Sequence, residues 1–473
     1  MSTHRKSGSN TTTKVPSFFS RLSALDSVYL STETLESPMH IACLVFLEAK
    51  PLLSPTGRLR TAAIRRHIEH QWATVEAVHV QLKPTANDTE PYAWGHSDDV
   101  RSCVEVTALP AQSDDRAVLD WCAAALTPVL PRDRPLWRVH LLSGLSQGRI
   151  GLLFQMHHAL CDGQGAAALL SSLMDSLKEP PSDKSKPESG MGEGPETSAD
   201  SATAAVHQLV NFARNGVHAA KQAVDLAEGV AFLTTNTRTR PPTSLNQTIT
   251  PERRLDTATI AFDAVQKIAH KLEATLNDVI LAMVTGALRS MLQDREEDVS
   301  ELTLEALVPV SMRLPDGNQA PGNRTAVLQV PLPVWEPSAL ERVRHIHLAT
   351  NERKKHHVAL AVSALESVAS FVPFALLHPV SKLSMRHQKL VNIVITNLRG
   401  PTEPLVFMGA QVLGVVPFLP LAPNLPLSVA VGSYGSTLEI GVQSDPQTCP
   451  EALMFTQNLI DEFSEIERRS CSS

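Results

Sequence analysis

The sequence has 473 residues, of which 43% are hydrophobic and 19% are charged, and its formal net charge is -7. A chain of this length commonly builds two hydrophobic cores, and the ordinary composition is typical of soluble globular proteins. The acidic balance argues against nucleic acid as a partner. Six scattered cysteines form no CxxC pair and no metal-ligand spacing, which fits a reducing cytosol and predicts neither disulfides nor a cysteine-bound metal.

The N-terminal twenty residues are polar and lack the apolar core of a signal peptide. A membrane-spanning helix needs about 18 apolar residues in a row. The nearest approach to such a run, residues 358–377, contains Glu366 and Pro373. We therefore expect a cytoplasmic protein whose contact with a membrane is peripheral.

Strand-like and helix-like patterns alternate in the first part of the chain. Residues 136–145 and 149–158 are typical of two strands around a Ser-Gln-Gly turn, and residues 165–177 are typical of a helix. The pentapeptide GLSQG, residues 144–148, matches the G-x-S-x-G pattern of hydrolase nucleophiles. That motif requires a strand-to-helix turn, whereas a strand is expected after this one, so we interpret it as a hairpin tip.

The composition changes sharply at residues 179–203, which are rich in Pro, Ser, Gly and charge. Such a segment buries too little apolar surface to offset its ordering entropy, and we expect a flexible linker. Residues 204–233 have apolar residues at helical spacing and predict one long amphipathic helix. This helix either packs against a domain, which its few Lys and Arg residues favour, or lies on a lipid surface.

A mixture of helices and strands returns after this linker and helix. We expect a helical region at residues 262–292 with a break near Leu276, strands at 325–334 and 391–398, and a hairpin at 427–444 that turns at Tyr434-Gly435-Ser436. The predicted fold class is therefore α/β (α+β). Its expected units are an N-terminal domain at residues 1–178, the linker and helix at 179–240, and a C-terminal domain at 241–473.

The stretch HHALCDG, from His157 to Gly163, stands where a strand is expected to end. A neutral histidine can accept a proton near pH 7, and loops at strand ends commonly display reactive groups. Asp162 is expected to orient a histidine or to hold the loop, and Gly163 permits a sharp turn or a close approach. Adjacent histidines on a strand point to opposite faces, so only one of them can face a given channel and a metal site is not expected.

The pattern HHxxxDG resembles the motif of coenzyme A-dependent acyltransferases and of peptide condensation domains. Further segments resemble bacterial wax ester synthase/diacylglycerol acyltransferases in the same order along the chain: residues 22–48 with Asp26 and Pro38-Met39-His40, the PLW motif at 134–137, Asn277-Asp278 within 275–289, VPVSMR at 308–313, GNR at 322–324 and ITNLRGPTEPL at 395–405. The resemblance runs from about Leu22 to Phe463 and leaves out the linker.

Two departures from the family pattern bear on substrate preference. The family usually has Ser-Asn-Val-Pro-Gly-Pro where this chain has Thr396 to Pro401, and usually has Asp where this chain has Pro131.

The resemblance implies two chloramphenicol-acetyltransferase-like domains with the active site between them. It also implies transfer of a long-chain acyl group from acyl-CoA, a co-substrate rather than a bound cofactor, to a fatty alcohol, to diacylglycerol or to both. A peripheral contact with the inner membrane or with lipid inclusions would deliver such apolar substrates.

The site residues follow from the chemistry and the resemblance together. His158 is expected to be the general base, without a covalent acyl-enzyme, and His157, Asp162 and Gly163 are expected to support it. Asn277 either contributes to an oxyanion site or caps a helix. Thr396 and Asn397 are expected to bind substrate.

Other residues have two open interpretations. Cys161 is either a nucleophile or, as we favour, a small buried residue. Trp137 either packs in the core, which we favour, or contacts substrate. Residues 352–357 either bind coenzyme A phosphates or form a solvated helix face, which we favour. Residues 366–389 either contact lipid or form a buried helix.

Two rival functions remain at this stage. A carrier-dependent condensation-type acyltransferase shares HHxxxDG but takes its substrates from tethered arms, and the other matching segments argue against it. A non-catalytic lipid-droplet binding protein could have this same fold, and the intact HHxxxDG argues against that.

Overall fold

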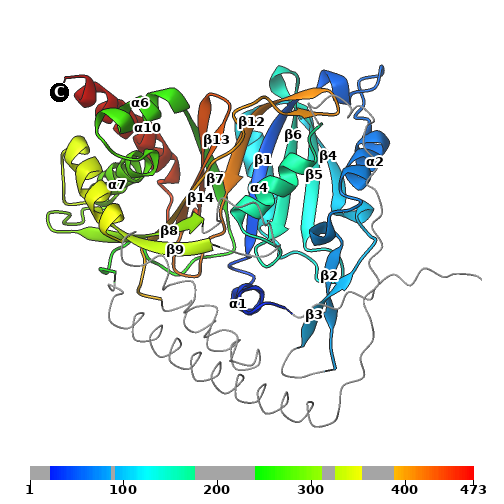
Figure 1. Ribbon diagram of the computed structural model, residues 1–473, viewed down its shortest axis with the longest axis horizontal. Coiled ribbons are helices and arrows are strands. Elements are labelled where there is room, and N and C mark those ends of the chain that lie inside the picture. The colour runs from blue at the N-terminus through cyan, green and yellow to red at the C-terminus, as the bar shows by residue number, and fades with distance from the viewer. Residues whose placement is uncertain (1–21, 87–90, 176–239, 312–324, 354–387, 473) are drawn as a thin grey trace, which may run out of the picture.

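The structure is a computed structural model that describes residues 22–86, 91–175, 240–311, 325–353 and 388–472 (Figure 1). These residues form two six-stranded sheets and one two-stranded hairpin. The mixed α/β fold with two sheets is the class that the sequence predicts. Residues 179–239, with the predicted linker and amphipathic helix, lie outside the described residues.

The first sheet has the strand order β11-β12-β1-β6-β5-β4. Its strands are β1 (His40–Glu48), β4 (Val104–Ser113), β5 (Trp137–Leu145), β6 (Arg149–His157), β11 (Val406–Phe407) and β12 (Ala410–Phe418). β5 and β6 confirm the two strands predicted there. The turn between them has Gln147 at φ 59° and Gly148 at φ +65°, and the antiparallel strand β6 follows directly, so GLSQG is a hairpin tip and not a nucleophile turn.

β12 comes from the second half of the chain, yet it pairs with β1 along most of its length. Ala42 lies opposite Phe418, and Val45 lies opposite Val415. Figure 1 shows β12 in orange beside β1 in blue. The second half therefore contributes to both sheets, and the predicted domain limits of 1–178 and 241–473 do not coincide with sheet membership.

Helices cover both faces of the first sheet. The helices of this half are α1 (Ala24–Thr32), α2 (Thr61–Gln71), α3 (Asp115–Leu126) and α4 (Gly163–Ser172). Leu169 of α4 packs with Val139 of β5, whereas Val118 of α3 packs with Leu142 on the opposite face. The remaining pieces are the hairpin strands β2 (Val80–Pro84) and β3 (Tyr92–His96) and the short 3-10 helices Lys50–Leu52, Glu76–Val78, Arg101–Cys103 and Ser146–Gly148.

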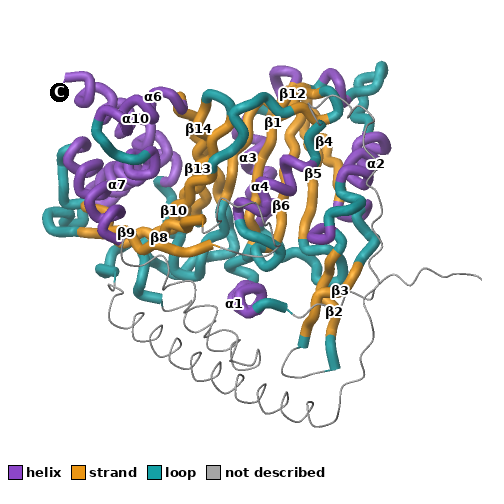
Figure 2. Tube along the Cα trace, viewed as in Figure 1, coloured by secondary structure: helices purple, strands orange, loops and turns teal. Residues whose placement is uncertain are grey.

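The second sheet has the strand order β7-β14-β13-β10-β8-β9. Its strands are β7 (Arg254–Ala261), β8 (Thr303–Ser311), β9 (Thr325–Pro333), β10 (Ile393–Leu398), β13 (Leu427–Tyr434) and β14 (Thr437–Ser444). The predicted hairpin is confirmed, because β13 and β14 pair antiparallel around Gly435, which has φ +54°. Figure 2 shows the strands of the two sheets side by side.

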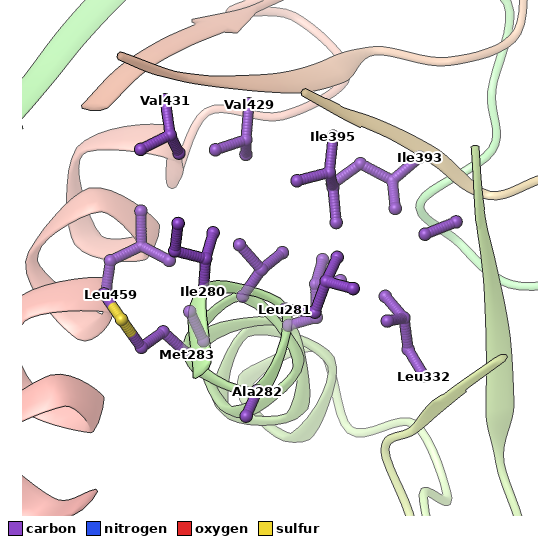
Figure 3. Packing of buried hydrophobic residues seen from close by; sticks show 14 of the residues in the cluster. Ile280, Leu281, Ala282, Met283, Leu332, Ile393, Ile395, Val429, Val431 and Leu459 are labelled. Atoms are coloured by element: carbon purple, nitrogen blue, oxygen red, sulfur yellow. The ribbon is translucent and has the colours of Figure 1, made fainter. Parts of the chain in front are cut away.

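Three helices, α6 (Phe262–Lys271), α7 (Leu276–Asp294) and α10 (Ala452–Ser472), pack with the second sheet and form its core. The predicted break near Leu276 is confirmed. It arises because the Thr275 side chain caps α7 by accepting from the backbone N–H of Asp278. Figure 3 shows Ile280 and Met283 of α7 between sheet residues and Leu459 of α10. Among the described helices, none is long and apolar enough to span a bilayer.

Candidate active site

A cavity of about 370 Å³ is lined by residues of both halves of the chain. From the first half, its lining includes α1, the end of β6 and the start of α4. From the second half, it includes residues of β10, β12 and β13. Most of the lining side chains are apolar, and the polar ones include Tyr29, His158, Asp162, Thr396 and Asn397. The cavity thus brings together five of the seven residues that the sequence suggests for the site: His158, Asp162, Gly163, Thr396 and Asn397.

The two histidines of the motif stand at the end of β6, which finishes at His157. The backbone N–H of His157 donates to Leu136 at 2.8 Å, and that of His158 donates to Met39 at 2.8 Å. His157 is 1% exposed and does not line the cavity, whereas His158 is half-buried and does. One histidine therefore faces the cavity, as strand alternation predicts.

His157 contacts a carboxylate that no sequence motif indicates. Its Nδ1 accepts from the backbone N–H of Ala159 at 3.0 Å, so a neutral ring carries its proton on Nε2. Nε2 lies 3.3 Å from Oε1 of Glu33. Burial alone would raise the pKa of Glu33, but hydrogen bonding and charge from His157, with His40 and the Met39 amide, lower it to about 2. A buried carboxylate therefore fixes the tautomer of His157.

His158 lies against an aromatic ring. Tyr29 stacks on it with a centroid distance of 4.1 Å and an interplanar angle of 18°. Burial lowers the pKa of His158 to about 4, and the charge of His157 acts in the same direction. Hydrogen bonding to its own backbone and the charge of Asp162 oppose this shift. The imidazole is therefore neutral at pH 7 and able to accept a proton.

Asp162 and Gly163 form the start of α4. The Asp162 side chain caps the helix by accepting from the backbone N–H of Gly165 at 2.8 Å. A Cβ on Gly163 would lie 3.2 Å from Cδ1 of Leu398, so the absent side chain allows β10 to approach α4 closely. Both residues shape the loop that follows the histidines.

Asn277 is not among the described residues that line the cavity. The interpretation of Asn277 as the helix cap is wrong, because Thr275 occupies that position. The adjacent Asp278 is fully buried and accepts from Thr350 at 2.8 Å and from Thr275, and its Oδ2 lies 2.8 Å from Nδ1 of His347. Asp278 thus joins α7 to the helical residues 339–353.

Trp137 and Cys161 are buried and pack against other residues of the core. Trp137 is fully buried, donates to the Val78 carbonyl at 2.9 Å and packs edge-on against Trp72, which agrees with a core role. Cys161 is buried, with its Sγ 3.4 Å from the Met156 sulfur, and is not among the described cavity-lining residues. Most of the segments 352–357 and 366–389 lies outside the described residues.

One group of side chains has the spacing of metal ligands within the described residues. His79, His96 and Asp98 bring ligand atoms within 4.8 Å of one another. However, the two ring nitrogens of His79 lie 3.3 and 3.0 Å from the backbone carbonyls of Ser97 and Trp72. Those contacts occupy the ring, and none of the three residues lines the cavity.

Sequence reasoning missed Tyr29 and Glu33, which both belong to α1 and its C-terminal cap. One signal was available: Ser23 and Asp26 form a capping box, a pattern that marks the start of a helix. A helix beginning there places residues 29 and 33 on one face, since they are four apart.

Comparison with known proteins identifies the family of this chain. The wax ester synthase/diacylglycerol acyltransferase catalytic domain matches residues 22–280, and the C-terminal domain of that family matches residues 321–467. A Mycobacterium tuberculosis protein with the provisional name diacylglycerol O-acyltransferase is 30% identical over 458 residues, covering 95% of this chain and 96% of the relative. Another from the same species, with a similar provisional name, is 29% identical over 374 residues, covering 76% and 77%.

Solved structures share the fold. The wax ester synthase/diacylglycerol acyltransferase from Marinobacter aquaeolei VT8 has a TM-score of 0.65 at 22% identity, covering 95% of this chain and all of that one. The starter condensation domain of rhizomide synthetase, solved with C8-CoA, has a TM-score of 0.60 at 16% identity, covering 97% of each chain.

The two α/β halves have the chloramphenicol-acetyltransferase-like fold of these solved structures. Among proteins with this fold, the chain belongs to the wax ester synthase/diacylglycerol acyltransferase family. It is an acyl-CoA-dependent O-acyltransferase.

Proposed function

We propose that this acyltransferase moves a long-chain fatty acyl group from acyl-CoA to a fatty alcohol, to diacylglycerol or to both. The observation that carries the proposal is His158, a neutral imidazole on the wall of a mainly apolar cavity between the two halves. An apolar cavity suits an acyl chain, and a neutral imidazole suits removal of a hydroxyl proton. The names of the relatives point to acylglycerol as acceptor, and the family name adds the alcohol.

His158 acts as the general base in a direct transfer. It takes the proton of the acceptor hydroxyl while the alkoxide oxygen attacks the thioester carbonyl carbon. The tetrahedral intermediate then collapses, the carbon–sulfur bond breaks, and the imidazolium gives its proton to the leaving thiolate. An ester and free coenzyme A form, and no covalent acyl-enzyme is needed because the cavity holds both reactants together.

The neighbouring residues prepare His158 for this role. The His157–Glu33 pair and the Asp162-capped start of α4 fix the two ends of the loop that carries it. Thr396 and Asn397, which line the cavity, are assigned to substrate contact. Asn277 is assigned to structural support rather than to the oxyanion, because it lies outside the cavity lining.

The long-chain acyl donor and the alcohol or diacylglycerol acceptor both partition into lipid. The protein therefore takes them up at the surface of the inner membrane or of a lipid inclusion. Acyl-CoA is a substrate in this scheme, and no further cofactor takes part in the reaction.

The test is release of coenzyme A thiol from palmitoyl-CoA by the purified protein, with hexadecanol and dipalmitoylglycerol offered separately. We expect acceptor-dependent release that falls by about 100-fold or more in His158→Ala, the range found when a general base is removed. The preferred acceptor identifies the product. Equal rates in wild type and variant would mean that another group is the base. Lack of release by folded wild-type protein with either acceptor would favour a lipid-binding role.

A further inference from the structure

The proposed reaction develops a negative charge that still needs a hydrogen-bond donor. When the acceptor oxygen bonds to the thioester carbon, the carbonyl oxygen becomes an oxyanion, and a donor already in place stabilises it most. Asn277 is not among the described residues that line the cavity, so it is not this donor. The attacking oxygen and the carbonyl oxygen are bound to the same carbon, and the donor must therefore lie close to the base, His158.

Tyr29 brings a hydroxyl close to His158. The two rings stack with a centroid distance of 4.1 Å and an interplanar angle of 18°, and both residues line the cavity. A phenol oxygen lies in the plane of its ring, so the stack holds this oxygen beside the imidazole. Tyr29 is thus a polar group of the cavity wall that is in direct contact with the base.

The hydroxyl of Tyr29 is available to a ligand. Tyr434, which also lines the cavity, accepts from the backbone N–H of Leu405 at 2.9 Å and donates to the Val412 carbonyl at 3.1 Å. By contrast, the Tyr29 hydroxyl makes no hydrogen bond to any residue that the structure describes, and its oxygen is not one of their buried, unpartnered polar atoms. A tyrosine hydroxyl in an apolar wall normally has a partner, and a substrate oxygen is the partner that this one lacks.

The hydroxyl also keeps the proton that it needs as a donor. Burial raises the pKa of Tyr29 above its usual value, and the charges of Asp162 and Asp26 act in the same direction. The Asp162 carboxylate accepts from the backbone N–H of Gly165 at the start of α4, where the helix dipole offsets its charge. Tyr29 is therefore a neutral donor at pH 7, the pH at which His158 is a neutral acceptor.

The helix that carries Tyr29 is fixed at several points. Ser23 and Asp26 form a capping box at the start of α1, and Asp26 also accepts from the indole N–H of Trp94 on β3 at 3.3 Å. Figure 1 shows α1 beside the β2–β3 hairpin. Leu30 packs with Leu82 and Trp94 in a small buried cluster. A donor held in this way needs little reorganisation when the charge develops.

We propose that Tyr29 is a catalytic residue whose hydroxyl donates a hydrogen bond to the thioester carbonyl oxygen of acyl-CoA and stabilises the oxyanion. The inference rests on the proposed function, because it supplies the donor for that reaction. As the acceptor oxygen bonds to the carbonyl carbon, the π electron pair moves to the carbonyl oxygen, and Tyr29 keeps its proton. When the pair returns, the carbon–sulfur bond breaks and His158 protonates the thiolate.

Tyr29→Phe separates the hydroxyl from the ring. The phenyl ring still covers His158, so the acidic limb near pH 4 should remain. We expect kcat to fall about 100- to 1000-fold, the range for loss of one oxyanion donor, and KM for palmitoyl-CoA to stay within about twofold. The control is Tyr92→Phe, which removes a hydroxyl on β3 outside the described cavity lining and should leave kcat unchanged. An unchanged kcat in folded Tyr29→Phe would overturn the proposal.

Infrared spectroscopy tests the hydrogen bond without turnover. Palmitoyl-CoA labelled with 13C at the carbonyl is bound in the absence of acceptor, and its carbonyl band is isolated by difference from the unlabelled complex. In wild type the band should lie at or below its frequency in water, because a donor lowers it. In Tyr29→Phe it should move towards the higher frequency found in hydrocarbon. A wild-type band at the hydrocarbon frequency would overturn the proposal, even if Tyr29→Phe fails to fold.

The two measurements together separate this inference from the proposed function. A lowered band that depends on Tyr29, in a protein that releases no thiol with either acceptor, would support the hydrogen bond and contradict the proposed transfer alone. Normal thiol release with the same band in wild type and Tyr29→Phe would overturn the role of Tyr29 alone.

Discussion

At the scale of single residues, burial shifts the pKa of His158 more than any neighbouring charge does. Desolvation is the main cause of its lowered pKa, and the opposing charge of Asp162 is smaller. The stacked ring of Tyr29 is part of the wall that removes water from the imidazole. Burial, with Asp162 and Asp26, in turn raises the pKa of Tyr29, so its hydroxyl stays protonated.

The pH dependence of activity follows from this environment. His158 accepts a proton only when neutral, and with a pKa of about 4 it is neutral at all pH values well above 4. We expect kcat/KM to stay level as the pH falls from 7 to 5 and to drop as it passes through about 4. Initial rates at each pH, with return to pH 7 to confirm recovery, measure this. An acidic limb near pH 6.5 would indicate a solvated base and contradict the desolvation of His158.

At the scale of elements, α7 packs so closely against α10 that there is no room for a side chain at Gly286. The guanidinium of Arg342, 2% exposed, pairs with the carboxylate of Glu462 on α10. A Cβ on Gly286 of α7 would lie 2.1 Å from Cδ of that carboxylate. The glycine thus lets α7 and α10 approach while the buried pair stays intact.

Gly286→Ala should therefore destabilise the protein, although alanine is the better helix former by about 1 kcal/mol. Overpacking against a buried ion pair is expected to lower the free energy of unfolding by about 1–3 kcal/mol. Urea denaturation measures the change. Adding Glu462→Asp, which withdraws the carboxylate by one methylene, should recover part of it. A more stable Gly286→Ala would mean that Glu462 moves aside freely.

Local patterns made many elements predictable. The short apolar runs of β5 and β6 and the Thr275 cap before α7 can each be recognised from a few consecutive residues. The pairing of Glu33 with His157 was not predictable, because it joins residues 124 positions apart through the packing of α1. HHxxxDG indicated His158 as the cavity-facing residue, but nothing near it in the sequence indicates the tyrosine that stacks on it.

At the scale of the whole molecule, local sequence patterns also do not predict that β12 pairs with β1 in the first sheet. Residues 410–418 have the composition of an ordinary strand, and only the tertiary fold shows that they pair with β1 rather than with the neighbouring second sheet. The two halves are therefore expected to depend on each other for folding.

This dependence is testable by expressing residues 1–178 alone. Without β12, the outer edge of β1 has unpaired backbone groups, and exposed edges promote aggregation. We expect the fragment to be insoluble or oligomeric and to become soluble when residues 179–473 are co-expressed. Size-exclusion chromatography and circular dichroism measure both states. A monomeric fragment that unfolds cooperatively on its own would contradict the expectation.

The pairing of β12 with β1 also imposes a delay during synthesis, because β1 is made long before its partner strand. Phe418 follows its partner Ala42 by 376 residues. At about 5–20 residues per second, the ribosome needs roughly 20–75 s to produce the strand that covers β1. Throughout that interval the nascent first sheet has an open edge. Synthesis of this acyltransferase should consequently depend on the supply of chaperones that bind nascent chains, and slowing translation should increase its aggregation rather than relieve it.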